Sequence, residues 1–492
     1  MKTAGIIGSG FSGLAAACTL AKEGYRVRVF EKNEGLGGRA RKFEEKGFMF
    51  DMGPSWYWMP EVFENFFNRF GKTTSDYYDL VRLDPSYNVV FGKDDIVSLP
   101  ADYSQLEQLF ESIEPGSAKN LGKFLKEAGY KYKVGMEEFV WKPGLSVSEF
   151  ADMRVLKSLF RLQMFSSISS QIEKLFENDK LRQILKFPVL FLGATPENTP
   201  ALYSLMNYAD LKLGTWYPMG GMHKIIEAFV ALAKELGVEF YTSEPVERID
   251  VVNNRVTGLT THKKSYPLDV LIASADYNHV EQHLLPERHR TYSESYWQKR
   301  TMAPSSLLFY IGLDTRIDGL EHHNLFFDRD FDLHAREIYT EPSWPTDPLF
   351  YISCPSKTDP SVAPQGHENI FMLMPLAPGI EDTEQLREQY FEVICDRMQG
   401  ILGVDIRPHI VYKRSFCIRD FVKDYNAFKG NAYGLANTLK QTAILKPRIR
   451  HKKIPNLYYA GQLTSPGPGM PPSIISGQMV AGLISEKNPV GK

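Results

Sequence analysis

Cysteine is scarce in this chain of 492 residues, and no two cysteines stand in a CxxC spacing. This pattern argues against a disulfide framework and against a cysteine-based zinc site. No charge-free apolar run reaches the roughly eighteen residues that a membrane-spanning helix needs. The formal net charge is only −2, so no overall field attracts the protein to nucleic acid or anionic lipid.

Neither the spacing of the histidines nor the N-terminal segment indicates a metal site or a targeting signal. The eleven histidines are scattered apart from the pair His322 and His323, and no metal site is predicted. No charged leader with an apolar stretch and a cleavage site is recognised at the N-terminus, where a glycine-rich loop begins at Gly8. These features favour a reduced, cytoplasmic compartment. The 43% hydrophobic content is that of a globular protein with a large core.

The first motif present is AGIIGSGFSGLAAA, residues 4–17. Gly8, Gly10 and Gly13 form GxGxxG between an apolar strand expected at residues 4–7 and a helix expected from Leu14. Such a turn aims backbone N–H groups and the positive end of a helix at an anion. The motif therefore predicts a cradle for the pyrophosphate of a dinucleotide.

The next segment indicates which dinucleotide is bound. YRVRVFE ends in Glu31, about 20 residues beyond the first glycine, where an acid accepts hydrogen bonds from a ribose. A 2′-phosphate would meet that carboxylate, so NADP is disfavoured. A second glycine loop, KNEGLGGRARKF, follows at once and presents Gly38 and Arg39. FAD, being longer than NAD, needs such a second loop.

A strand predicted from GFMFDMGPSW breaks at Gly53 and Pro54, in a turn that could lie along the flavin. GSGFSG, Glu31, GLGGRA and GFMFDMGP together resemble the N-terminal signature of FAD-dependent amine oxidase-like proteins, specifically the bacterial-type phytoene desaturases. NLYYAGQLTSPGPGMPPSIISGQMVAGLI, residues 456–484, resembles the closing motif of that family. YPMGGMHKIIEAFVALAKELGVEF and GNAYGL resemble further blocks. The likeness therefore covers nearly the whole chain.

The closing motif adds residues to the predicted FAD site. Its aromatic strand would deliver Gly461 to the cofactor, and the two prolines after Met470 suit the first turn of a helix that includes Ser473. The positive end of that helix would face the flavin and stabilise the reduced ring. By resemblance, Val246 would hold the adenine through its backbone.

The resemblance implies removal of two hydrogens from a lipid-soluble carotenoid, with phytoene to lycopene as the best single reaction. Desaturation of C30 or hydroxylated carotenoids and carotene isomerisation stay open, with quinone or O2 as the final electron acceptor. Trp56, Tyr57 and Trp58 could stack along the polyene, and Glu149 and Asp152 are weak candidates for the proton acceptor. Outside this class, an amine oxidase or a flavin-free Rab escort or GDI-like protein shares the architecture.

The expected organisation is α/β, with a Rossmann-like FAD-binding domain of the glutathione reductase and amine oxidase type. Residues 1–70, 214–290 and 430–492 would form this discontinuous domain. Residues 71–99 and 291–429 would form a mixed-sheet substrate domain. Residues 100–213 would form a helical, membrane-associating cap, because apolar side chains recur there at helical spacing. The protein would then attach peripherally to the inner face of the cell membrane.

Overall fold

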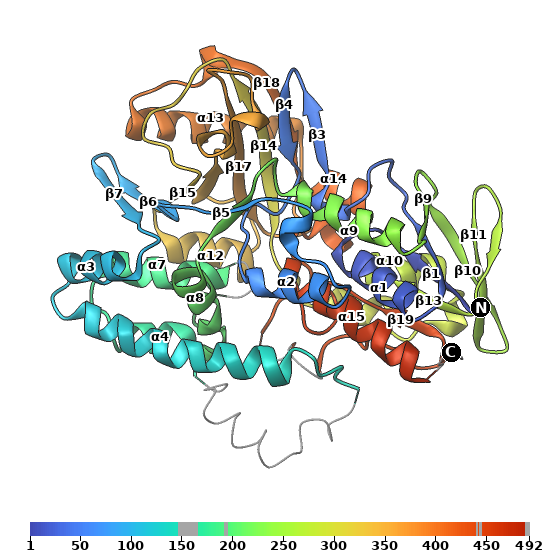
Figure 1. Ribbon diagram of the computed structural model, residues 1–492. Coiled ribbons are helices and arrows are strands. Elements are labelled where there is room, and N and C mark those ends of the chain that lie inside the picture. Colours follow the sequence, from blue (N-terminus) through green and yellow to red (C-terminus); the bar gives the residue numbers. More distant parts are fainter. Residues whose placement is uncertain (146–165, 191–194, 439–440, 442–444, 488–492) are drawn as a thin grey trace.

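Two sheets and a layer of helices make up the computed structural model, which describes residues 1–145, 166–190, 195–438, 441 and 445–487. Figure 1 shows the two sheets side by side, with α3 (Tyr103–Ile113), α4 (Ser117–Val134) and α7 (Asp179–Leu190) grouped at one end of the larger sheet. The predicted proton acceptors Glu149 and Asp152 lie outside the described residues.

The first sheet has five strands, all parallel. Their spatial order is β19 (Leu457–Tyr459), β13 (Val270–Ala273), β1 (Thr3–Ile7), β2 (Arg26–Phe30) and β9 (Glu239–Tyr241). Ile6 packs into the core on one face and Ile7 into the core on the other. Such strands are apolar on both sides, which is why AGII reads as an unbroken hydrophobic run.

Helices cover one face of this sheet and a small antiparallel sheet covers the other. The helices are α1 (Phe11–Lys22), α2 (Pro60–Asn68), α9 (His223–Glu235) and α15 (Met470–Lys487). The small sheet comprises β10 (Val246–Val252), β11 (Arg255–Thr261) and β12 (Ser265–Pro267). The hairpin between β10 and β11 turns at Asn253 and Asn254, both with positive φ. The predicted Rossmann-like arrangement is thus present.

Glycines set the start of two helices. The helix after the glycine loop begins at Phe11 rather than at the predicted Leu14, because Gly10 already serves as its N-cap with extended backbone angles. α9 begins at His223, because Gly220 and Gly221 before it adopt φ of 89° and 98°. In both cases glycine conformation fixes where the helix starts.

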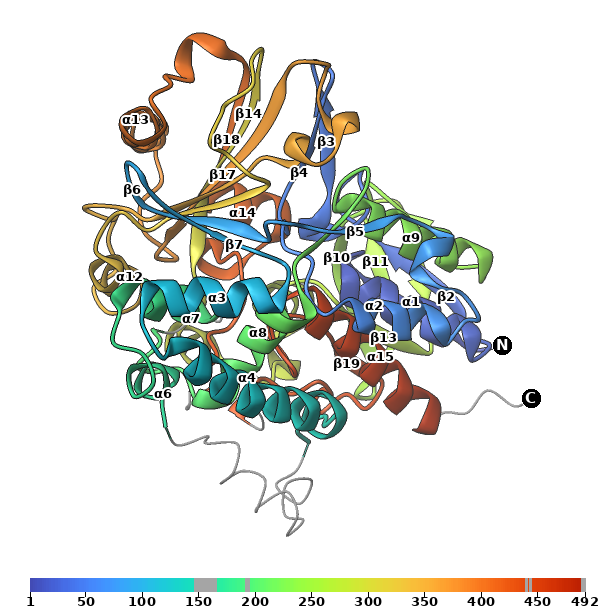
Figure 2. The same ribbon diagram turned by 60° about the vertical axis from the view of Figure 1, so that its left-hand side comes forward.

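The chain ends meet where α1 and α15 cross. Gly477 of α15 packs directly on the backbone of α1, beside Ser12 and Ala16. Both views show these two helices side by side, at opposite ends of the colour scale (Figures 1 and 2). α1 and α15, from opposite ends of the described chain, therefore form one packed unit.

The second sheet is mixed and has seven strands. Their order is β18 (Ile410–Phe416), β14 (Ser305–Leu313), β17 (Glu368–Leu376), β16 (Phe350–Ser353), β15 (His323–Phe326), β6 (Tyr87–Gly92) and β7 (Asp95–Leu99). β15 and β6 pair in parallel and the other neighbours are antiparallel. Side chains alternate along β14. Leu307 and Phe309 pack with α13 (Glu384–Leu402), while Leu308 and Tyr310 belong to the core on the opposite face.

The remaining elements connect these layers. They are β3 (Lys42–Glu45), β4 (Phe48–Asp51), β5 (Leu80–Arg82), β8 (Trp216–Pro218), α6 (Ile168–Glu173), α8 (Leu205–Tyr208), α10 (Tyr277–His279), α11 (Glu294–Gln298), α12 (Phe331–Tyr339) and α14 (Ile418–Tyr425). Figure 2 shows α3, α4, α6, α7 and α8 as one helical layer beneath the larger sheet. Within the described part of the chain, no helix is both long and apolar enough to cross a membrane.

Candidate dinucleotide site and aromatic cavity

One cavity of about 740 Å³ runs between the two sheets and reaches the helical layer. Its wall contains nearly all of the predicted site residues, namely Gly8, Gly10, Glu31, Gly38, Arg39, Gly53, Pro54, Trp56, Trp58, Val246, Gly461, Met470 and Ser473. Two predicted residues, Gly13 and Tyr57, do not line it. Segments separated by more than 400 positions in the sequence therefore share one wall.

The glycine loop is shaped by close backbone contacts. Gly8 has a φ of 95°, and its N–H donates to the carbonyl of Phe30 at 2.8 Å. A Cβ on Gly13 would collide with the carbonyl oxygen of Gly8, so this glycine permits the helix to approach the loop. Gly10 differs, because a Cβ there would meet nothing within 4 Å. The open space lies in front of the first turn of α1, where an anion is stabilised.

Glu31 fixes the loop from the end of β2. Its Oε2 accepts hydrogen bonds from the N–H and hydroxyl of Ser9, at 3.1 and 2.7 Å. Its Oε1 accepts from the N–H and side-chain amide of Asn33, at 2.9 and 3.0 Å. The carboxylate is 4% exposed and lines the cavity. Besides facing the position predicted for a ribose, it holds the glycine loop to the strand that follows.

Arg39 places a guanidinium inside the cavity. Its Nη2 donates to the carbonyl of Asn431 at 3.2 Å, and its charge lies 5.0 Å from the centre of the Tyr425 ring. Its Nε is buried and has no hydrogen-bond partner within the described residues. Burial lowers the pKa of Arg39, which indicates strong desolvation of the charge. A guanidinium in the wall of a cavity suits a phosphate or a flavin oxygen.

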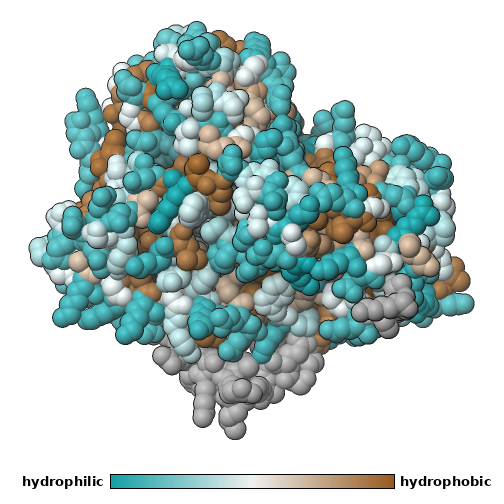
Figure 3. Space-filling model, viewed as in Figure 1, coloured by the Kyte–Doolittle hydropathy of each residue, from teal (hydrophilic) through white to brown (hydrophobic). Residues whose placement is uncertain are grey.

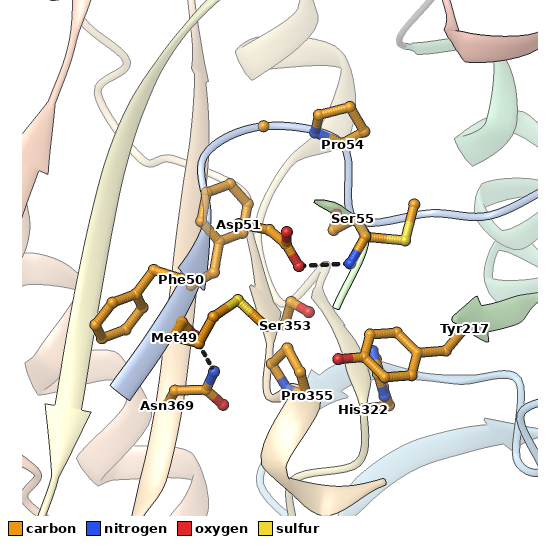
Figure 4. Close-up of a pocket in the computed structure, with 13 residues that line it drawn as sticks. Met49, Phe50, Asp51, Pro54, Ser55, Tyr217, His322, Ser353, Pro355 and Asn369 are labelled. Carbon is orange, nitrogen blue, oxygen red and sulfur yellow. Dashed lines mark hydrogen bonds between the residues drawn. The ribbon is translucent and has the colours of Figure 1, made fainter. Parts of the chain in front are cut away.

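Asp51 anchors the turn at Gly53 and Pro54. Its two oxygens accept from the N–H groups of Met222 and His223, at 2.7 and 2.8 Å, and so cap the start of α9. Desolvation raises the pKa of Asp51 to about 6. Figure 4 shows this carboxylate beside a small pocket of about 20 Å³ that Gly53 and Pro54 also line. Asp51 therefore links the strand before this turn to the start of α9.

The closing loop brings a second helix N-terminus to the cavity. The N–H of Gly461 donates to the hydroxyl of Ser476 at 3.0 Å, which ties the end of β19 to α15. α15 begins at Met470, within the cavity wall, as the prolines of the motif predict. The first turns of α1 and α15 therefore both face the cavity and favour negative charge there.

Aromatic residues form the wall on the side of the second domain. Trp56 and Trp58 line the cavity with ring centres 5.3 Å apart, and Trp56 stacks on His323 at 4.1 Å. Tyr57 points the other way, because side chains alternate in this extended segment. It is fully buried, stacks on Phe63 and hydrogen-bonds to the hydroxyl of Tyr78. The structure therefore brings two of the three predicted aromatics to the cavity.

Some residues of the site carry no signal that sequence reasoning used. Tyr425 and Asp424 reach the cavity from α14, where Asp424 pairs with Arg41 at 2.7 Å although 383 positions separate the two. Tyr351, on β16, hydrogen-bonds to Ser55 at 3.1 Å. Nothing in the local spacing of these residues marks them. Their role follows only from strands and helices that fold together over long distances.

The cavity suits a flavin dinucleotide on three counts. Open space lies in front of the glycine cradle at Gly10, and Arg39, whose Nε has no hydrogen-bond partner within the described residues, lines the same cavity. The wall continues from Val246 on one side to the helix N-terminus at Met470 on the other, as an extended dinucleotide requires. The residues present therefore fit the group that the sequence motifs predict.

Lys446 is an unusual cation beside the closing loop. It is 5% exposed, and its Nζ donates to the carbonyl of Pro466 at 2.8 Å. The closing loop passes close to this Nζ, since a Cβ on Gly467 would lie 2.5 Å from it. Burial lowers the pKa of Lys446 from 10.5 to about 7. Between pH 7 and 10.5, this lysine therefore carries a proton in the unfolded chain that it does not carry in the folded chain.

The free energy of unfolding is expected to rise with pH between 7 and 10.5 through this group, since the unfolded state holds the extra proton. A Lys446→Met variant should be more stable than the natural protein at pH 7 and should show a flatter pH dependence. Urea unfolding midpoints at pH 7 to 10 measure both effects. The exposed Lys299, changed to Met, is the control. Equal slopes for Lys446→Met and the natural protein would contradict this assignment.

The fold joins a Rossmann-like domain, of the kind that binds dinucleotides, to a second, mixed sheet, and the cavity lies between them. The sequence model of flavin containing amine oxidoreductases matches residues 11–485, and the chain belongs to that family, among its carotenoid desaturases. The expected flavin-dependent oxidoreductase is thereby confirmed.

Three curated relatives carry desaturase names. A carotenoid 3,4-desaturase from Haloarcula japonica is 42% identical over 482 residues, covering 98% of this chain and 97% of that protein. A 4,4′-diapophytoene desaturase (4,4′-diaponeurosporene-forming) from Staphylococcus aureus is 33% identical, with 95% of both chains covered. A zeta-carotene-forming phytoene desaturase from Myxococcus xanthus is 31% identical, covering 96% of this chain and 92% of that protein.

Solved structures agree on the fold. An oxidoreductase from Methanosarcina mazei superposes with a TM-score of 0.64 at 16% identity, over 98% of this chain and 100% of that chain. Cyclohexylamine oxidase from Brevibacterium oxydans superposes with a TM-score of 0.59 at 16% identity, over 99% of both chains. At such identities the likeness is one of fold and does not identify a substrate.

Proposed function

We propose that the protein is an FAD-dependent desaturase that introduces carbon–carbon double bonds into a long carotenoid. The observation that carries this proposal is the single cavity, which joins the glycine cradle to the wall of Trp56 and Trp58. Beyond that wall, apolar residues of η3 (Gly135–Phe139) and α8 continue the lining, among them Met136, Phe139 and Met206. A polyene is apolar along its length and needs such a lining.

The cofactor would be held by both chain ends. The loop at Gly8 and Gly10 and the first turn of α1 would hold the pyrophosphate, with Glu31 at a ribose and Val246 at the adenine. Arg39 and the N-terminus of α15 would lie on the flavin side. When bound, the flavin supplies an acceptor for hydride from a C–H bond.

The chain's own task is mainly to position the substrate. Trp56 and Trp58 offer flat apolar faces along which a conjugated chain can stack, and the ring faces also favour positive charge on it. The tight turn at Gly53 and Pro54 sets these aromatics beside the cradle. A substrate that fills the cavity would displace water from it and be held in one geometry, which together lower the barrier.

Two reactions are candidates within this class. Desaturation at the 3,4 position, near one end of a carotenoid, is supported by the 42% identity to a relative with that name. Conversion of phytoene to lycopene, the reaction favoured from the sequence, is supported by phytoene-type relatives at 31 to 33% identity. We favour desaturation at the 3,4 position, because the identity to the carotenoid 3,4-desaturase is higher than the identity to the phytoene-type relatives.

Access from a bilayer is part of the proposal. A carotenoid dissolved in lipid would enter past η3, where Trp141 is 42% exposed close to the cavity lining. On the face shown in Figure 3, hydrophobic residues form separate patches among hydrophilic ones.

The helical cap at residues 100–213 would contact the inner face of the cell membrane peripherally. The electron acceptor would be a quinone or O2. The FAD-binding and substrate domains would keep the boundaries inferred from the sequence.

Purified protein with FAD, in detergent or lipid vesicles, is tested under anaerobic conditions with phytoene, lycopene and a hydroxylated lycopene derivative. The expected result is bleaching of the flavin absorbance and a product that has lost two hydrogen atoms and absorbs at longer wavelength. Reaction of the already conjugated substrates but not phytoene supports the 3,4 assignment. Oxidation of an amine, with no change in any carotenoid, would refute the proposed function.

A further inference from the structure

A buried carboxylate stands behind the aromatic wall of the cavity. Asp210 lies in η6 (Ala209–Leu213), is 2% exposed and does not line the cavity. Its Oδ2 accepts a hydrogen bond of 2.7 Å from the hydroxyl of Tyr87. Its Oδ1 accepts one of 3.3 Å from the hydroxyl of Thr215. Both oxygens act as acceptors, which suits the ionised form.

These two partners connect Asp210 to both tryptophans of the wall. The indole N–H of Trp58 donates to the Thr215 hydroxyl oxygen at 2.9 Å, so the chain runs from indole to hydroxyl to carboxylate. The ring of Tyr87 packs against Trp56 edge to face, with centres 5.3 Å apart. One carboxylate therefore fixes the orientation of both rings that face the cavity.

No basic side chain pairs with Asp210 among the residues that the structure describes. Lys212 of η6 lies over the ring of Tyr103, Lys186 of α7 pairs with Glu173, and Arg82 of β5 donates to the carbonyl of Ala101. Within the described part of the chain, the negative charge of Asp210 is therefore not neutralised by a neighbouring cation.

Such a charge is unfavourable for folding, because a buried ion loses its hydration. Desolvation raises the pKa of Asp210 to about 7, although its two hydroxyl partners act in the opposite direction. A neutral side chain could join the same elements without this penalty. The charge itself therefore calls for an explanation beyond structural support.

The proposed desaturation offers an explanation for the buried charge of Asp210. Hydride would leave one carbon of the polyene with both electrons of its C–H bond, for the acceptor that a bound flavin would supply. Positive charge would develop on the polyene until the neighbouring carbon releases a proton, which passes finally to solvent, and the new double bond forms. During this step a nearby negative charge is favourable, and in an interior that excludes water it acts over several ångströms.

We propose that Asp210 is a positioning residue that orients Trp56 and Trp58 and, through them, stabilises positive charge on the bound polyene. This inference rests on the proposed function. It differs from a proton-acceptor role, because Asp210 lies behind the indoles and does not face the substrate. The effect is expected mainly on the rate of hydride loss and only weakly on substrate binding.

Asp210→Asn is the decisive variant, because it keeps the size of the side chain and removes the charge. Anaerobic stopped-flow reduction of the flavin by a carotenoid substrate measures the chemical step. The rate constant is expected to fall about tenfold, the order for one charge acting across a partly polar interior. Binding of the polyene, followed by quenching of tryptophan fluorescence, should change less than about threefold, since the apolar lining is intact.

Thr215→Val is the matched control, because it removes the tether of Trp58 and one hydrogen bond to Asp210 but keeps the carboxylate itself. It should weaken polyene binding more than it slows flavin reduction. The rate in the natural protein should also rise with pH through about 7 as Asp210 ionises, and this rise should vanish in Asp210→Asn. Tyr87→Phe removes a donor to the carboxylate and should move the midpoint of that rise to higher pH.

Two results would overturn the inference. One is an unchanged rate of flavin reduction in Asp210→Asn. The other is an equal loss of polyene binding and of rate in that variant, which would mean a purely structural role. If Asp210→Asn does not fold, the pH midpoint of Tyr87→Phe decides in the same way. Failure of the natural protein to oxidise any carotenoid would instead refute the proposed function, so the two failures are distinguishable.

Discussion

A Gly10→Val variant is expected to fold normally and to purify without bound flavin. Gly10 precedes α1 with φ of −70° and ψ of 177°, a backbone conformation that valine adopts readily. A Cβ there meets nothing within 4 Å, so the side chain has room in the protein. That room is the space in front of the N–H groups of the helix, where the pyrophosphate would bind.

The loss of affinity should be large because an anion at a helix N-terminus must approach the backbone closely. We expect the FAD dissociation constant to rise at least about 100-fold, equivalent to nearly 3 kcal/mol. Flavin absorbance after gel filtration and titration of the protein with FAD measure it. The melting temperature of the flavin-free protein should stay within about 3 °C of the natural one, as for a surface substitution.

Gly92→Val provides the matched control for Gly10→Val. Gly92, at the end of β6, also has open space where a Cβ would lie, and it does not line the cavity. This control should bind FAD with natural affinity. A yellow Gly10→Val protein with natural affinity would show that the pyrophosphate binds elsewhere, and the assignment of the cradle would then be abandoned.

Gly477→Val should be the most destabilising substitution at the helix crossing. A Cβ at this position would collide with the carbonyl oxygen of Ser12 and would lie 3.0 Å from Ala15 and Ala16 of α1. These are mostly backbone atoms, which cannot move away without separating the helices. The free energy of unfolding should fall by about 3 kcal/mol or more, since overpacking cannot be relieved by a side-chain rotation.

Flavin binding should weaken in the same variant. Ser476, the residue before Gly477, accepts the hydrogen bond from Gly461, so a displaced α15 also displaces the closing loop. Gly482→Val, on the same helix but with open space around its Cβ, should cost almost nothing. Urea unfolding and FAD titration compare the two variants. Equal stability of Gly477→Val and Gly482→Val would disprove the close crossing of α1 and α15.

Local motifs predicted the strand, loop and helix at the N-terminus well. The strand expected at residues 4–7 is present as β1, and Gly8, Gly10 and Glu31, which are predicted to bind the dinucleotide, line one cavity. The strand is predictable because a glycine loop between a buried strand and a helix is specified by neighbouring residues. The boundary of the helix was missed by three residues, since the motif does not reveal that Gly10 already acts as its N-cap.

The aromatic segment shows the limit of local reasoning. The local sequence does not distinguish the consecutive aromatic residues Trp56, Tyr57 and Trp58. In the structure, Tyr57 packs on Phe63 in the core while its two neighbours line the cavity. Which side of an extended segment faces a ligand depends on the surface against which it packs. Here the pairing of Tyr57 with Trp216 settles that orientation.

The sequence by itself determined the family and, with it, a flavin, and it predicted that both chain ends bind this flavin, because each inference rests on short motifs whose geometry is local. Only the tertiary structure decided which side chains meet at the cavity, and it revealed Asp210 and Lys446 as buried charges without ionic partners in the described structure. The physical reason is that burial belongs to the packed surroundings of a residue. An aspartate or a lysine in a sequence carries no mark of the hydration it will lose.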